Sequence, residues 1–120
     1  MKTVLVAEDN AVNRELIAEI LEASDYRVIQ AVDGLDALRL LGFHRPDVVL
    51  LDMQMPKLDG KETLRAIRAN PDLADLRVVA CTAYAMQGDR EEILRCGFDA
   101  YISKPIFRAE LLQAVGPASS

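Results

Sequence analysis

The chain has 120 residues, a formal net charge of −5 and a hydrophobic share of 51%. A chain of this length forms one domain with one core, so we expect residues 1–120 to be a single domain. The acidic balance argues against direct contacts with nucleic acid or anionic membrane. No apolar run has the length of a signal-peptide core or a membrane span. Because Cys81 and Cys96 show no disulfide or metal-ligand spacing, we expect a reduced, cytoplasmic protein.

Five short apolar runs alternate with five segments of helical periodicity along the chain. The predicted strands are Val4–Ala7, Arg27–Ala31, Asp47–Leu51, Arg77–Cys81 and Ala100–Ile102, and the predicted helices are Val12–Ala23, Leu35–Leu41, Lys61–Ala69, Arg90–Cys96 and Arg108–Val115. Uninterrupted apolar runs of this length fit strands that are buried on both faces. The alternation therefore predicts an α/β fold, (βα)5, with a doubly wound parallel sheet and helices on both faces. We expect residues 117–120 to be a frayed tail.

Several polar residues have a structural explanation as helix N-caps. The candidates are Asn10, Asp33, Asp59 and Asp89, with Glu62 and Glu92 placed three residues after the last two as in a capping box. The only histidine, His44, precedes Arg45 and Pro46 at the opposite edge of the sheet from the strand ends. We interpret it as a loop residue rather than a ligand or a base.

Three other acids stand at strand ends: Glu8 and Asp9 follow the first strand, and Asp52 follows the third. Ligands of such sheets bind at the carboxyl ends of the strands. Two carboxylates brought to ~4 Å repel by about 4 kcal/mol at an effective dielectric constant of ~20, so the cluster needs a proton or a cation. Hard oxygens with open positions suit Mg²⁺. The alternative, that Asp9 caps a helix and Asp52 begins a turn, stays open on these residues alone.

Two further strand ends carry Thr82 and Lys104. Together with the acids they offer carboxylates, a hydroxyl and an ammonium to one pocket, and no Ser-His or Cys-His pair accompanies them. That set suits phosphoryl transfer to a carboxylate, with Asp52 as the nucleophile and Lys104 and a divalent cation neutralising the phosphoryl oxygens.

The ordered motifs Glu8-Asp9-Asn10, Asp52–Gly60, Thr82-Ala83 and Lys104-Pro105 resemble those of response-regulator receiver domains over nearly the whole chain. The resemblance implies a flavodoxin-like, CheY-like sheet of order 2-1-3-4-5. It is similar both to DivK-type single-domain regulators and to receivers fused to hybrid sensor kinases, and the sequence does not separate the two.

The resemblance also implies residue roles. Asp52 would accept a phosphoryl group from a phosphohistidine, and Mg²⁺ would be held by Asp9, Asp52, the backbone carbonyl of Gln54 and, through water, Glu8. Thr82 and Lys104 would bind the phosphoryl group, and Tyr101 would turn inward as Thr82 moves. The Lys104-Pro105 peptide bond would be cis. Such a protein is a phosphorylatable switch in a phosphorelay rather than an enzyme with turnover.

Its partners would be a sensor histidine kinase or a histidine phosphotransfer protein, and a downstream protein effector. The apolar residues of the first helix cover about half its circumference, which is wider than a core stripe requires. We expect the donor to dock on Asn13, Arg14, Leu16, Pro105 and Ile106. A wide but buried helix face is the alternative.

Three competing functions are weaker. A small phosphohydrolase that forms an aspartyl phosphate needs a second acid two residues after the nucleophile, where Gln54 stands. A carrier of flavin mononucleotide needs a glycine- and hydroxyl-rich loop after the first strand. A receiver that only binds partners, without phosphorylation, would have no use for the complete set of Asp9, Asp52, Thr82 and Lys104.

Overall fold

The computed structural model describes residues 2–83 and 87–116, the side chains of residues 87–89 excepted. Strands and helices alternate in the order β1 (Thr3–Ala7), α1 (Ala11–Ala23), β2 (Arg27–Ala31), α2 (Gly34–Leu41), β3 (Val48–Asp52), α3 (Gly60–Ala69), β4 (Arg77–Thr82), α4 (Gln87–Arg95), β5 (Ala100–Ser103) and α5 (Arg108–Val115). The expected frayed tail, residues 117–120, lies outside the described residues.

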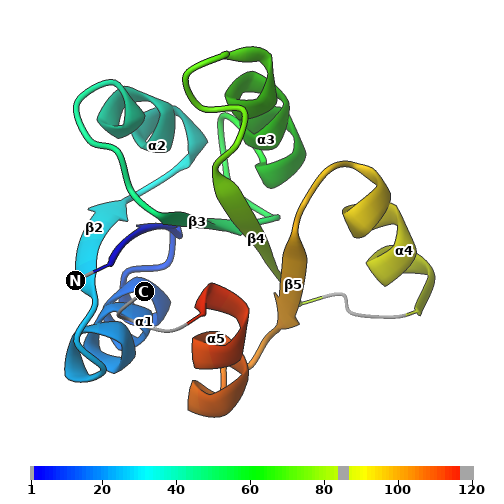
Figure 1. Ribbon diagram of the computed structural model, residues 1–120. Coiled ribbons are helices and arrows are strands. Elements are labelled where there is room, and N and C mark those ends of the chain that lie inside the picture. Colours follow the sequence, from blue (N-terminus) through cyan, green and yellow to red (C-terminus); the bar gives the residue numbers. More distant parts are fainter. Residues whose placement is uncertain (1, 84–86, 117–120) are drawn as a thin grey trace.

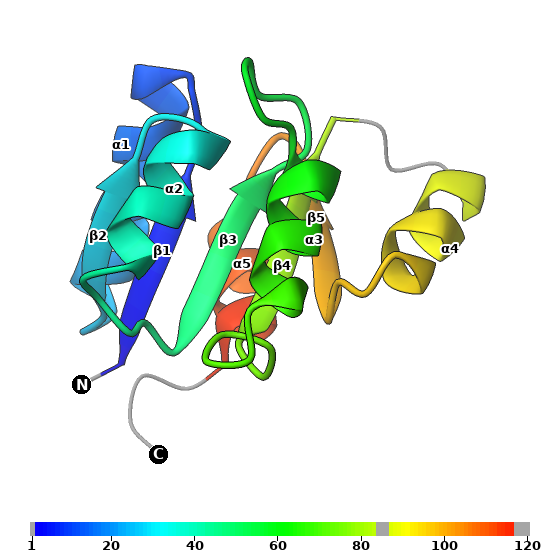
Figure 2. The same ribbon diagram turned by 90° about the horizontal axis from the view of Figure 1, so that it is seen from above.

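All strand pairs in the sheet are parallel, and the strand order is β2-β1-β3-β4-β5 (Figure 1). This confirms the predicted doubly wound topology. Each strand enters from one edge of the sheet and ends at the other, so the loops that follow the strands gather along a single edge (Figure 2). The residues after β1, β3, β4 and β5 therefore lie near one another despite their distance in sequence.

Helices cover both faces of the sheet, α1 and α5 on one and α2, α3 and α4 on the other (Figure 1). Alternate residues of each central strand enter the two cores. Val4 and Val6 of β1 pack with α1 and α5, whereas Leu5 and Ala7 pack with α2 and α3. Because side chains of a strand point to opposite faces in turn, a strand buried on both sides has no polar alternation. The uninterrupted apolar runs of the sequence have this origin.

Three of the expected N-caps are confirmed. The Asn10 side chain accepts a hydrogen bond from the backbone N–H of Asn13 in α1 at 3.0 Å. The Asp33 side chain accepts one from the backbone N–H of Asp36 in α2 at 2.7 Å. Asp59 and Glu62 form a complete capping box at the start of α3. These bonds satisfy backbone N–H groups that the first helical turn leaves without acceptors.

The fourth expected cap, Asp89, is wrong. Helix α4 already begins at Gln87, so Asp89 lies inside the helix. The spacing of Asp89 and Glu92 resembles a capping box and placed the start too late, because an acid pair three residues apart also occurs inside helices. Since α4 lies beside β5 and away from the strand-end acids, the error does not alter the site.

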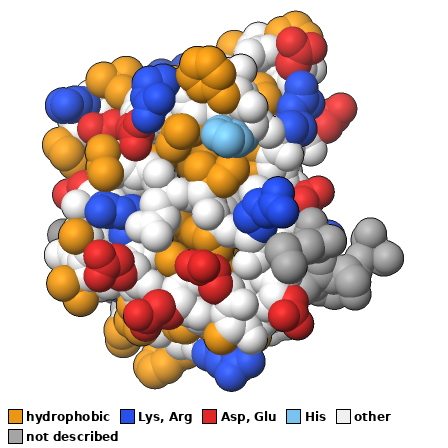
Figure 3. All heavy atoms as spheres, turned by 90° about the vertical axis from the view of Figure 1, so that its left-hand side faces the viewer, with side chains coloured by type: hydrophobic (Ala, Val, Ile, Leu, Met, Phe, Trp, Pro, Cys, Tyr) orange, Lys and Arg blue, Asp and Glu red, His pale blue; other side chains and the backbone are white. Residues whose placement is uncertain are grey.

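The surface carries both charge signs. On the face at the β2 edge, acidic and basic side chains are interspersed without a large region of one sign (Figure 3). Among the described residues, none of the helices combines the length and the apolar character needed to cross a bilayer.

Candidate functional site

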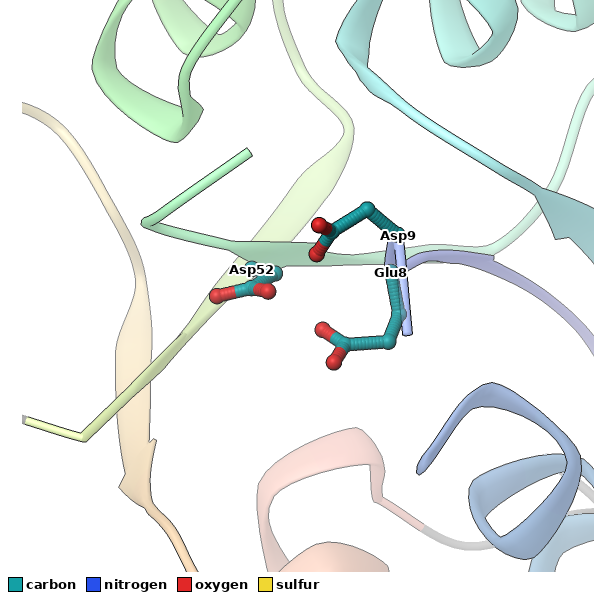
Figure 4. Close-up of side chains that lie close together, drawn as sticks. All are labelled: Glu8, Asp9 and Asp52. Atoms are coloured by element: carbon teal, nitrogen blue, oxygen red, sulfur yellow. The ribbon is translucent and has the colours of Figure 1, made fainter. Parts of the chain in front are cut away.

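Three carboxylates from two strand ends meet at the edge where the strands end. Glu8 and Asp9 follow β1, Asp52 is the last residue of β3, and one oxygen of each lies within 4.8 Å of the others. The three side chains point toward a common space (Figure 4). Glu8 and Asp52 are each only 2% exposed, whereas Asp9 is exposed at the mouth. The sequence prediction that these acids lie together is confirmed.

A single ammonium lies between the two buried acids. Lys104 Nζ is 3.2 Å from Asp52 Oδ2, and it is 3.3 and 3.4 Å from the two oxygens of Glu8. Lys104 follows β5, its peptide bond to Pro105 is cis as expected, and its backbone N–H donates to the Thr82 carbonyl at 2.8 Å. The ammonium thus partly neutralises both carboxylates.

The charge of the cluster is reflected in its pKa values. Burial, a hydrogen bond with Asp52 and the negative charge of Asp52 raise the pKa of Glu8 to about 7, against the opposing effects of Lys104 and Asn13. Burial disfavours the charged form of Lys104, but Asp52 and Glu8 outweigh this effect and raise the pKa of its ammonium. The raised pKa of Glu8 thus reflects burial and crowded negative charge, which a bound cation would relieve.

Gln54 contacts both the remaining oxygen of Asp52 and the hydroxyl of Thr82. The backbone N–H of Gln54 donates to Asp52 Oδ1 at 3.1 Å, and its side-chain amide lies 3.5 Å from Thr82 Oγ1. Thr82 is 2% exposed and ends β4, the strand beside β3. Glu8, Asp9, Asp52, Thr82 and Lys104 thus form one site, with Gln54 at its rim.

The donor set fits a small divalent cation. Its ligand atoms are carboxylate oxygens, which hard cations prefer, and no sulfur or imidazole accompanies them among the described residues. The exposed position of Asp9 leaves room for water on the open side. Three acids facing one lysine also leave negative charge that a divalent cation would balance.

Two residues of α1 contact the site in a way that the sequence analysis missed. The Asn13 amide donates to Glu8 Oε1 at 3.3 Å, and Arg14 Nη1 donates to the Glu8 carbonyl at 2.8 Å. Both were expected only as docking residues. Their place in the first turn of the helix that follows Glu8 was the available signal, because side chains on that turn can point back to the strand end.

The expected docking residues divide into two groups. Four of them, together with Lys104, line one small groove of about 110 Å³: Asn13, Leu16, Pro105 and Ile106. The fifth, Arg14, turns toward Glu8 and Gln30. The wide apolar face of α1 is partly open, with Leu16 47% and Val12 74% exposed. The alternative of a fully buried helix face is therefore wrong.

Two other residues lie apart from the acids. Tyr101 is half-buried on the face of α4, β5 and α5, where it lines an open hollow of about 550 Å³, and the guanidinium carbon of Arg90 is 4.9 Å from its ring centre. His44 is exposed in the loop after α2, as expected.

Comparisons with known proteins agree with this geometry. Residues 4–116 match the family described as response regulator receiver domain. The polar-differentiation response regulator DivK of Brucella anthropi is 40% identical over 114 residues, which cover 95% of this chain and 93% of that protein. The receiver domain of the sensor histidine kinase PA1611 from Pseudomonas aeruginosa, solved with a magnesium ion coordinated in its active-site cleft, is 39% identical with a TM-score of 0.87, covering 95% of this chain and 93% of that one. The chemotaxis response regulator CheY4 of Vibrio cholerae is 26% identical with a TM-score of 0.90, and 96% of each chain is covered.

The fold and the strand-end acids define a receiver domain, that is, a phosphoacceptor switch of two-component signalling. The chain belongs to the response-regulator receiver family. The competing phosphohydrolase is not favoured, because the relatives are response regulators and Gln54 stands where that chemistry needs an acid.

Proposed function

We propose that Asp52 accepts a phosphoryl group from a phosphohistidine of a sensor histidine kinase or a histidine phosphotransfer protein, with residues 1–120 acting as a single receiver domain. One observation carries the proposal. The Asp52 carboxylate is buried at a strand end, 3.2 Å from Lys104 and within the acid cluster that fits a divalent cation.

The transfer is a displacement at phosphorus. An oxygen of Asp52 forms the new P–O bond, the P–N bond of the phosphohistidine breaks, and the imidazole keeps the electron pair and takes up a proton. The Lys104 ammonium, already 3.2 Å from Asp52, pairs with the phosphoryl oxygens as their charge arrives. No nucleotide site is required, because the donor supplies the reactive bond.

We assign the cation as Mg²⁺, which would add positive charge against the phosphoryl oxygens when bound. Asp9, Asp52 and the backbone carbonyl of Gln54 would hold it directly, and Glu8 through water. The exposed Asp9 and the buried pair of Glu8 and Asp52 support this assignment.

The phosphoryl group would bring about −1.5 to −2 charges into the site and bias a two-state equilibrium. In the second state the Thr82 hydroxyl would hydrogen-bond the phosphoryl group and Tyr101 would turn inward. The effector would read the change on the α4, β5 and α5 face, and the donor would dock in the groove of Leu16, Pro105 and Ile106 beside Asn13 and Arg14. The open hollow beside Tyr101 supports an output surface there.

Incubation with acetyl phosphate and magnesium, followed by intact mass measurement, tests the proposal. We expect one added phosphoryl group per chain in the wild type and none after Asp52→Asn. Asp72→Asn is the matched control, because Asp72 is exposed in the loop between α3 and β4, at the opposite edge of the sheet. Its phosphorylation should equal that of the wild type.

An addition that persists after Asp52→Asn would place the phosphoryl group elsewhere and refute the assignment. Absence of any addition to the folded wild type would refute the phosphoacceptor function itself. The requirement for magnesium is checked in the same assay by adding a chelator, which should abolish the reaction.

A further inference from the structure

The side chain of Asn13 is held so that its amide faces the acid cluster. The Asn10 side chain accepts a hydrogen bond from the backbone N–H of Asn13 at 3.0 Å, which fixes the first turn of α1. From there Asn13 Nδ2 donates to Glu8 Oε1 at 3.3 Å. Arg14, the next residue, donates to the Glu8 carbonyl at 2.8 Å. The backbone and the carboxylate of Glu8 are thus each tied to α1 by a separate side chain.

Glu8 has a second donor in Lys104, but that donor is shared. Lys104 Nζ contacts Glu8 at 3.3 and 3.4 Å and Asp52 at 3.2 Å. In the proposed function the ammonium turns to the phosphoryl group once Asp52 is modified. The hydrogen bond from Asn13 is then the side-chain contact to Glu8 that this movement does not disturb.

We propose that Asn13 is a positioning residue, which holds the Glu8 carboxylate in the orientation that the cation site requires while Lys104 serves the phosphoryl group. The inference rests on the proposed function, since it presupposes that magnesium binds at this cluster. A neutral amide suits the role, because it directs a carboxylate without adding a positive charge that would compete with the cation.

The effect of removing Asn13 is separable from damage to the helix. Ala has a higher helix propensity than Asn, so Asn13→Ala should leave α1 intact. Asn13→Gln keeps the amide donor on a longer side chain and should restore most of the function. Val12→Ala is the matched control, because Val12 is the preceding residue in the same turn and is 74% exposed.

The experiment is a magnesium titration of the wild type and the three variants by calorimetry, combined with the rate of phosphorylation by acetyl phosphate. Acetyl phosphate is chosen because Asn13 also lines the docking groove, which a small donor does not need. Replacement of the hydrogen-bond partners of direct metal ligands costs 10- to 100-fold in affinity. Because Glu8 would reach magnesium through water, we expect Asn13→Ala to weaken magnesium binding by less than this, up to roughly 10-fold. The phosphorylation rate should fall at low magnesium and return to the wild-type value at saturation.

Unchanged magnesium affinity in Asn13→Ala would overturn the inference while leaving the proposed function intact. A lower rate at saturating magnesium, or a lower melting temperature of the metal-free protein, would indicate a general structural role and would also overturn it. Failure of the Asn13→Gln variant to recover affinity would count against the amide as the operative group. If the wild type itself binds no magnesium, the proposed function fails first and the inference with it.

Discussion

At the edge where the strands end, three carboxylates face one ammonium, whereas at the edge where they begin, arginines are bonded to backbone carbonyls. Arg68 donates to the carbonyls of Ala74, Leu76 and Gly97 and to the Asp99 carboxylate, at 2.6–3.0 Å. Arg77 donates twice to the Ala114 carbonyl, at 3.0 and 2.8 Å. The same sheet thus carries an acid cluster with excess negative charge at one edge and a set of well-satisfied cations at the other.

The difference separates stability from function. Each arginine joins separate segments of the chain, and its hydrogen bonds satisfy carbonyls in loops or in the last turn of α5. The acids at the other edge repel one another, and burial together with the charge of Asp52 raises the pKa of Glu8. Because one ammonium does not balance the charge of three carboxylates, binding of a cation or attachment of a phosphoryl group can change the contacts within this cluster. We therefore expect substitutions at the strand-start edge to alter stability, and those at the strand-end edge to alter it in ways that depend on pH and magnesium.

The largest effect is expected for Arg68→Ala. It removes four hydrogen bonds, leaves three carbonyls without this donor and leaves Asp99 without its ion pair, so the free energy of unfolding should fall by about 3–4 kcal/mol. Urea unfolding measures it, with and without magnesium. The loss should be the same in both conditions, and a loss that magnesium relieves would break the proposed separation of the two edges. Arg65→Ala, an exposed neighbour on α3, is the control.

The features of the two edges that depend only on topology or on local sequence could be predicted from the sequence alone. The strand-end acids were predictable, because parallel strands must end at one edge and the apolar runs mark where each one stops. The N-caps Asn10, Asp33 and Asp59 were predictable for a similar reason, since a cap acts on its own helix. Such local and topological rules do not need side-chain distances.

Other features depend on the tertiary arrangement. Arg68 reads in sequence as an ordinary helix residue, and only the packing of α3 against the segments before β4 and β5 reveals its carbonyl partners. The contact of Asn13 with Glu8 likewise depends on the angle between α1 and the sheet. The start of α4 was mispredicted because a plausible cap, Asp89, lies within the helix.

A smaller effect is expected for Glu8→Gln. The pKa of Glu8 is raised from 4.5 to about 7 in the folded protein. Between these two pH values, the Glu8 carboxyl is protonated in the folded state and ionised in the unfolded state. The stability from this proton is fully present below pH 4.5 and disappears as the pH rises through 7. Gln is neutral throughout. In the absence of metal, the wild type should therefore lose roughly 3 kcal/mol relative to Glu8→Gln between pH 4.5 and 8.

Urea unfolding of both proteins in a chelator at several pH values measures that difference. If the free energy of unfolding changed with pH equally in the wild type and in Glu8→Gln, the raised pKa of Glu8 would be refuted. Glu19→Gln, an exposed acid further along α1, is the matched control and should follow the wild type.

The smallest effect is expected for Lys104→Ala, which removes the cation of the strand-end edge as Arg68→Ala removes one from the other edge. Without metal, Glu8 and Asp52 then lack their shared ammonium. The lysine side chain is 22% exposed and Glu8 can bind a proton, so the loss should be limited to about 1 kcal/mol at pH 8.

Magnesium should remove this loss, because a bound divalent cation stabilises the folded state and supplies the positive charge that Lys104 provided. Urea unfolding at pH 8 with saturating magnesium and with a chelator measures both values. Removal of the lysine also removes a cation that competes with magnesium for the carboxylates. Magnesium should therefore raise the free energy of unfolding more in Lys104→Ala than in the wild type. If instead magnesium left the loss unchanged, as expected for Arg68→Ala, the ammonium at the strand-end edge would be a fixed structural tie, and the two edges would not differ in the way their contacts indicate.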